Sequence, residues 1–307
     1  MSSKAFCWNR QAGTEQFIWL SARNQEGQIY NKISARLCAI FINAALAIVS
    51  SLLLLSQAQA SPNVPTIVSL DGCADQYVLG LVPRAQILAL SDRSRLADSY
   101  FRDRAAGIRR TQPRLETLLA LHPDIVVRTW GGDPKLIQRL TDDGITVVNI
   151  KDSDTFDQAH AELIRIGHRL GQDASARIEA HNLDTALDQV KNVGKGRSVL
   201  YYTPSGFTAG KGGLIADMLR RLGFRIDTQI QYDYLIPPEA LLSMKPDVFA
   251  LGFYEDRYAM RRVPGRNPLV RNLIANTPHF TLPMRAISCS GWFTAYDLRD
   301  LSQYGIR

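Results

Sequence analysis

The hydrophobic pattern of the chain contains one unit twice, a short apolar helix that stops at Pro-Asp and leads into an apolar strand. The first copy covers residues 116–127 and the second covers residues 239–250. The residue before a proline disfavours the helical conformation, so we expect the helices to end at His122 and Lys245. The strands that follow lack polar alternation, which is typical of parallel sheets covered by helices on both faces. The repeat therefore predicts two α/β lobes, each with its own sheet.

The remainder of the chain before residue 151 alternates between apolar strands and amphipathic helices. We predict strands over 66–70, 87–90 and 145–150, a helix that follows the turn at residues 71–73 and runs to about residue 82, and a helix over about 134–142. This alternation indicates a parallel or mostly parallel sheet. Residues 91–112 form a long polar connection rich in arginine, and a connection of this length is usually functional or mobile.

Helical spacing of apolar residues continues from about 154 to 193 with no strand between. We expect Gly171 to end a first helix and Asp173 to cap a second. The second helix would run for about twenty residues, roughly 30 Å. It lies between the two predicted lobes and has the composition of a rigid connector rather than of a flexible linker. Beyond it, we predict strands over 197–202 and 284–287 and helices over 214–222 and 294–302.

The first sixty residues have the pattern of an export signal. Arg36 precedes an uncharged apolar run over 37–55, and Ala58 and Ala60 occupy the small-residue positions of a cleavage site. We therefore expect export with cleavage after Ala60. The alternative is a retained membrane anchor, because the apolar run approaches the length that spans a bilayer.

The chain thus divides into four parts. They are a signal peptide and leader over 1–60, an N-terminal α/β lobe over 61–172, a connector helix over 173–194 and a C-terminal α/β lobe over 195–307. Export leaves Cys73 and Cys289 in the mature chain, and an even pair in an oxidising compartment favours a disulfide. The alternative is two small buried apolar side chains.

Composition excludes several classes of function. The net charge is +7 over 307 residues, but no block of lysine and arginine stands out, so we do not expect nucleic-acid binding. The five histidines are scattered and no cluster has metal-ligand spacing, which predicts no site for a bare metal ion. No Gly-x-Ser-x-Gly elbow is present, so we expect no catalytic residues and no enzyme activity. An exported hydrolase and a sensor module remain as alternatives.

Several segments, taken in order, carry a resemblance to a known family. They are the apolar leader, residues 66–69 followed by Cys73-Ala-Asp75, the two repeat units, the helix end at 167–171 and Phe207-Thr-Ala-Gly210. Together they resemble the periplasmic substrate-binding proteins of ABC importers for vitamin B12 and ferric siderophores. The resemblance implies a monomeric periplasmic protein with two Rossmann-like lobes, mostly parallel sheets and one long connector helix, which delivers a ligand to a membrane permease.

The resemblance also implies a role for the glutamate that opens each repeat unit. Glu116 and Glu239 match the positions that bind arginines of the permease, one on the outer surface of each lobe. We expect them at the end of each unit opposite the ligand loops. A local explanation is also available, because a carboxylate in the first turn of a helix interacts favourably with the helix dipole.

In this architecture the loops that follow the strands face the ligand. The candidate ligand-binding residues in these loops are Trp130, Tyr202, Phe207, Tyr254 and Trp292, and the further candidates are Tyr100, Arg257 and Arg261. Aromatic walls suit a corrinoid, whereas arginine and tyrosine hydroxyls suit an anionic ferric siderophore. We therefore expect a cobalamin or ferric-siderophore type of metal chelate as transported ligand, with haem as the alternative, and no bound cofactor.

Overall fold

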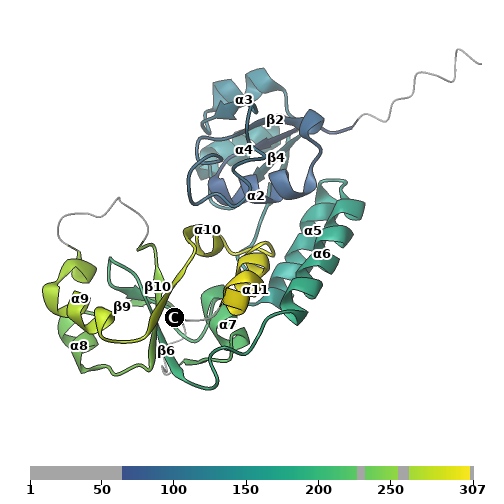
Figure 1. Ribbon diagram of the computed structural model, residues 1–307. Helices are drawn as coiled ribbons and strands as arrows, with labels where there is room; N and C mark the ends of the chain where they lie inside the picture. The colour runs from purple at the N-terminus through teal and green to yellow at the C-terminus, as the bar shows by residue number, and fades with distance from the viewer. Residues whose placement is uncertain (1–63, 227–231, 255–262, 305–307) are drawn as a thin grey trace, which may run out of the picture. The chain divides into compact units, whose positions relative to one another are not determined.

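The computed structural model of the protein describes residues 64–226, 232–254 and 263–304. The predicted leader with its cleavage site after Ala60, and the candidate ligand residues Arg257 and Arg261, lie outside this range. From Val64 onward the chain forms one compact unit that contains two parallel sheets and the helices around them (Figure 1). No helix in the described part of the chain has the length and apolarity needed to cross a membrane.

The first sheet contains five parallel strands in the order β3-β2-β1-β4-β5. The strands are β1 Ile67–Ser69, β2 Ile87–Ser91, β3 Arg110–Thr111, β4 Ile125–Arg128 and β5 Thr146–Asn149. The helices of this region are α2 Gly72–Leu81, α3 Leu115–Leu121 and α4 Pro134–Asp142. The polar connection over 91–112 ends in the short edge strand β3, which the apolar pattern does not predict.

The strands of this sheet are apolar on both faces because each face has its own core. Ile67 and Val127 pack with residues of α2. Val68 and Val126, which point to the other face, pack with Leu118 of α3 and with residues of α4. Successive side chains of a strand alternate between faces, so a doubly covered strand has to be continuously apolar.

The second sheet contains four parallel strands in the order β11-β10-β6-β8. The strands are β6 Ser198–Tyr202, β8 Arg225–Ile226, β10 Val248–Gly252 and β11 His279–Leu282, and the helices are α7 Leu214–Arg221, α8 Pro238–Ser243 and α9 Pro268–Ala275. A separate antiparallel pair joins β7 Phe207–Thr208 to β9 Tyr234–Leu235. The α/β class and the parallel sheets agree with the prediction.

The predicted strand over 284–287 is wrong. Met284–Ile287 is a short helix, α10, and the strand is β11, which ends at Leu282. Pro283 lies between them as the N-cap of α10, and the fixed φ of proline favours the start of a helix there. The last helix is α11, Thr294–Tyr304.

The repeated Pro-Asp pair makes equivalent contacts in the two sheets. Asp124 accepts hydrogen bonds from the backbone N–H and the hydroxyl of Thr66, at 2.7 and 2.8 Å. Asp247 accepts the same two bonds from Ser198, at 2.7 and 2.8 Å. The hydrogen bonds from the neighbouring strand lower the pKa of both carboxyls. Each aspartate therefore joins the amino ends of two adjacent strands, which confirms the repeat unit.

Two helices connect the sheets in the sequence. They are α5, Phe156–Arg169, and α6, Asp173–Asp188, which pack side by side (Figure 1). Gly171 has a φ of +67° and follows the end of α5 as predicted, since glycine adopts this conformation without steric cost. The helix predicted over 173–194 is shorter, with 16 residues. At the start of α5, the backbone N–H of Phe156 donates to Asp217 of α7 at 3.0 Å.

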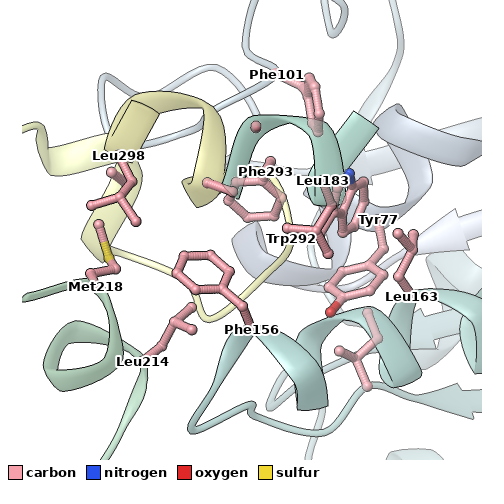
Figure 2. Packing of buried hydrophobic residues seen from close by; sticks show 14 of the residues in the cluster. Tyr77, Phe101, Phe156, Leu163, Leu183, Leu214, Met218, Trp292, Phe293 and Leu298 are labelled. Carbon is pink, nitrogen blue, oxygen red and sulfur yellow. The ribbon is translucent and has the colours of Figure 1, made fainter. Parts of the chain in front are cut away.

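The largest hydrophobic core joins both halves of the sequence. It includes Tyr77 of α2, Leu163 of α5 and Leu183 of α6, and it continues to Met218 of α7 and Leu298 of α11 (Figure 2). Residues from the start, the middle and the end of the described chain therefore share one core.

Candidate functional site

One buried carboxylate organises the carboxyl end of β1. Asp71 follows this strand and caps α2, where its Oδ1 accepts hydrogen bonds from the backbone N–H groups of Cys73 and Ala74 at 3.2 and 2.9 Å. Its Oδ2 accepts from the backbone N–H groups of residues 129–131 at 2.7, 3.1 and 2.8 Å. The loop after β4 is thereby fixed against the start of α2. Sequence reasoning identifies Asp71 only as a turn residue, although an aspartate before an apolar helix is a recognisable cap signal.

Trp130 stands in that loop with a fixed backbone and an exposed side chain. Its backbone N–H is one of the three bound by Asp71, yet 58% of the residue is exposed. The next residue is Gly131, where a Cβ would lie 2.7 Å from the carbonyl oxygen of Leu70. Only glycine allows this close approach of the loop to β1. The predicted ligand residue is therefore an indole on a rigid support, with its face open to solvent.

Trp130 lines a cavity of about 80 Å³ at the carboxyl edge of the first sheet. The cavity is lined by Gly72, Cys73, Arg93, Asp98, Ser99, Trp130, Ser288 and Cys289. The guanidinium of Arg93 pairs with Asp98 at 2.6 Å. Cys73 and Cys289 form a disulfide with a Cα–Cα distance of 5.4 Å, which confirms the predicted pairing. The disulfide is thus part of the wall of this cavity.

The carboxyl edge of the second sheet carries a small apolar surface. β7 begins a few residues after the end of β6, and the backbone N–H of Thr203 donates to the carbonyl oxygen of Phe207 at 2.9 Å. Phe207 pairs with Leu235 of β9, and the two residues are 47% and 59% exposed. Tyr232 precedes β9 and is 65% exposed. Phe207, like Trp130, is therefore available to a ligand.

Two of the predicted ligand residues are core residues in this structure. Trp292 is fully buried, with its ring centroid 4.8 Å from that of Tyr77, and its indole N–H donates to Glu179 at 3.1 Å. Tyr202 is fully buried in a core cluster of the second sheet. Neither residue presents surface to a ligand here, so neither belongs to the candidate site. A position after a strand does not by itself reveal which layer its side chain enters.

Two further candidates are partly buried. Tyr254 follows β10, and burial raises the pKa of its phenol. Its hydroxyl has no hydrogen-bond partner among the described residues. Tyr100 packs on Phe293 with ring centroids 5.1 Å apart, and burial raises the pKa of Tyr100 to about 12. Tyr100 thus lies in an aromatic cluster of the core rather than beside Trp130.

The two glutamates of the repeat units are exposed. Glu116 lies in the first turn of α3 and Glu239 in the first turn of α8. Helix α3 starts a few residues after the carboxyl end of β3. Helix α8 starts just after β9, which pairs with β7 close to the carboxyl end of β6. A helix between parallel strands runs back against them, so its first turn lies toward their carboxyl ends. The expectation that the glutamates lie opposite the ligand loops is therefore wrong, because both lie toward the same edges as those loops.

A buried titratable group lies in the first turn of α2, the helix that Asp71 caps. Asp75 of α2 is fully buried and accepts hydrogen bonds from the hydroxyl and the backbone N–H of Ser91, the latter at 2.9 Å. Burial raises the pKa of this carboxyl to about 7. Among the described residues, no group of three or more histidines, cysteines, aspartates or glutamates is placed to hold a metal ion. The site therefore offers aromatic and hydrogen-bonding surfaces to a ligand.

Comparison with known proteins gives a family match. The sequence model described as periplasmic binding protein matches residues 67–253, more than half of the chain. Comparison with curated protein sequences gave no significant match.

Several solved structures share the fold. A possible iron-binding periplasmic solute-binding protein from Staphylococcus epidermidis has 21% sequence identity and a TM-score of 0.62, covering 78% of this chain and 97% of that one. The periplasmic heme-binding protein RhuT from Roseiflexus has 17% identity and a TM-score of 0.60, with coverages of 78% and 97%. The periplasmic heme-binding protein HutB of Vibrio cholerae has 17% identity and a TM-score of 0.62, with coverages of 79% and 99%.

Proposed function

The chain belongs to the periplasmic binding protein family, and from this premise we propose that it is the substrate-binding component of an ABC importer for a planar metal chelate. It captures the chelate at the carboxyl edges of its two sheets and delivers it to a membrane permease. Export into the periplasm, with removal of the leader after Ala60, is part of the same proposal.

The observation that carries the proposal is the pair of exposed apolar surfaces at those edges. Trp130 follows β4 of the first sheet, and Phe207 with Leu235 follows β6 of the second. In open α/β sheets, ligands bind outside the carboxyl ends of the strands. Flat aromatic side chains offer a planar ring system a large contact area without a polar group that needs a partner.

The proteins with the same fold favour an iron chelate. The proteins from Roseiflexus and Vibrio cholerae are described as heme-binding, and the one from Staphylococcus epidermidis as possibly iron-binding. These descriptions favour haem over cobalamin and over a ferric siderophore for the site around Trp130. The binding experiment below distinguishes haem from cobalamin and from a ferric siderophore.

The permease would be contacted through Glu116 and Glu239. Each is an exposed carboxylate in the first turn of a helix, one in each lobe. Since both lie toward the carboxyl edges, a permease that binds them also covers the ligand surfaces. Docking at these residues therefore directs the bound ligand at the permease.

Binding is tested on residues 61–307 by titration with haemin, cyanocobalamin and a ferric siderophore, followed by absorbance and by tryptophan fluorescence. We expect saturable binding of haemin. Trp130→Ala should weaken it roughly tenfold, as expected for a central aromatic contact. The control is Ile178→Ala, which removes a 62% exposed apolar side chain of α6 and should leave the affinity unchanged. Absence of saturable binding for all three probes would contradict the proposal.

A further inference from the structure

We propose that the Cys73–Cys289 disulfide and the segment 284–304 fix the protein surface beside Trp130 in position, so that this bond increases ligand affinity. The segment, here named the C-terminal clasp, comprises α10, α11 and the loop between them. The cavity of about 80 Å³ at this surface is smaller than a metal chelate, so it is one part of the ligand surface, and the identity of that surface as a ligand site rests on the proposed function. The mechanical role of the clasp rests on the contacts below.

The covalent contact joins the two halves of the sequence at the cavity. Cys73 lies in the first turn of α2, next to Asp71, which fixes the loop of Trp130. Cys289 lies in the loop of the clasp, beyond the last strand of the second sheet, and 216 positions separate the two cysteines. The bond therefore connects the carboxyl edge of the first sheet to the chain that leaves the second sheet.

Aromatic packing of Trp292 on Tyr77 holds the clasp on α2 (Figure 2). The ring of Trp292 lies 4.8 Å from that of Tyr77 and 6.2 Å from that of Phe101. Gly80 of α2 makes room for the indole, since a Cβ at this position would lie 2.7 Å from it. A large side chain of the clasp is thus seated in a gap on α2, and a displacement of the clasp would expose it.

Polar contacts hold the clasp on the connector at the same time. Glu179 of α6 accepts hydrogen bonds from the indole N–H of Trp292 at 3.1 Å and from the hydroxyl of Tyr296 at 2.8 Å. Within the clasp, Arg285 binds Asp297 through two nitrogens, at 2.6 and 3.0 Å. The clasp is therefore fixed to α2 and to α6 and is braced internally between α10 and α11.

Residues of the clasp and of the first sheet's loops together form the wall of the cavity. Ser288 and Cys289 of the clasp form one part of the wall, and Trp130 and Arg93 form another. The wall at Cys289 cannot withdraw from the start of α2 while the disulfide is intact. A site that is held in its binding geometry before the ligand arrives has a lower ordering cost on binding. The disulfide should therefore increase the affinity for the ligand.

The experiment compares oxidised wild-type residues 61–307 with Cys73→Ala/Cys289→Ala, without a reductant, because reductants react with ferric chelates. We expect the double variant to bind haemin roughly tenfold more weakly. Without ligand, we expect faster amide hydrogen exchange over 72–81 and 294–304 in the variant. The matched control is Lys135→Ala, an exposed residue of α4 that keeps the bond, and both its exchange over these segments and its haemin affinity should equal those of wild type.

The outcomes test the role of the disulfide and the proposed function separately. Haemin affinity of the double variant within twofold of wild type overturns the inference, whatever the exchange measurement shows. If haemin, cyanocobalamin and the siderophore all fail to bind wild type, the proposed function fails, and the exchange measurement still tests the clasp. If the double variant does not fold, reduction of folded wild type by a phosphine before the exchange measurement replaces it, since Cys73 and Cys289 are the only cysteines of residues 61–307.

Discussion

Asp71 and Asp75 both lie at the start of α2, and both side chains are buried, but their surroundings differ. Asp71 accepts hydrogen bonds from five backbone N–H groups, as a buried carboxylate requires. Asp75 accepts hydrogen bonds from the hydroxyl and the backbone N–H of Ser91, and burial raises its pKa to about 7. Asp71 thus positions the loop of Trp130, whereas Asp75 is a proton-binding group within the core.

Asp75 predicts a stability that depends on pH. Its pKa is raised from 3.8 to about 7 in the folded protein, so the folded state holds the proton more tightly than the unfolded state. The stabilisation that this proton gives the folded protein is fully present below the pKa of Asp75 in the unfolded state. It is lost as the pH rises through the pKa of Asp75 in the folded state. Each tenfold difference in proton affinity between the two states is worth about 1.4 kcal/mol.

The variant Asp75→Asn isolates this contribution. Urea unfolding at several pH values from about pH 4 to about pH 8 should show wild type losing a few kcal/mol relative to the variant. Equal pH dependence of the two proteins would mean that Asp75 does not titrate between folded and unfolded states in this range.

Secondary-structure elements differ in how well the sequence predicts them. The bounds of α4 agree with the prediction because its apolar residues keep helical spacing and Asp133 caps it. The two residues of β3 and the four of β11 are not predicted, since Arg110 and His279 interrupt the apolar pattern and the partner strand supplies the pairing. Tertiary pairing, which no local pattern records, decides such short strands.

The residues of the candidate site also differ in how well the sequence predicts them. Trp130 and Phe207 are predicted because aromatic residues after strands are visible in the sequence, and the structure places both at the surface. Arg93 and Ser288 are not predicted, since only the folded chain brings these distant positions to one cavity. Trp292 is an aromatic residue of the same kind as Trp130, and only the gap at Gly80 makes it a core residue.

The variant Gly80→Ala tests how tightly Trp292 fills the gap on α2, because a tight fit and a loose fit change the stability of the protein in opposite directions. On a solvated helix, Gly→Ala stabilises by about 1 kcal/mol, because alanine has the higher helix propensity. In α2 the added Cβ would lie 2.7 Å from the ring of Trp292, so Gly80→Ala should destabilise the protein by about 1–3 kcal/mol. Urea unfolding measures the change. A more stable variant would show that the indole moves aside without cost.

At the scale of the whole molecule, the ligand surfaces and the proposed docking residues share the carboxyl edges of the two sheets. Trp130 and Phe207 lie at these edges, and the first turns of α3 and α8 carry Glu116 and Glu239 toward them. One partner surface can therefore contact both glutamates while it covers the ligand. Under the proposed function, this shared position would link release of the ligand to docking.

Charge reversal tests the docking role. Glu116→Arg combined with Glu239→Arg should abolish uptake of the ligand in cells, because like charges then face the permease arginines. Haemin affinity of the purified variant should stay unchanged. The matched control is Asp142→Arg, at the end of α4 that leads to the amino end of β5, where uptake should persist. Normal uptake by the double variant would exclude docking through these glutamates.

The disulfide also has a consequence for how the protein is made. Cys73 is near the start of residues 61–307 and Cys289 is near their end, with 216 positions between them. In an exported chain that emerges from its amino end, the bond can form only after nearly the whole polypeptide has crossed the membrane. If the leader is removed after Ala60 as proposed, residues 61–307 contain no third cysteine that could form a mispaired bond. Under the proposed function, formation of this bond would then need an oxidant but no disulfide isomerase.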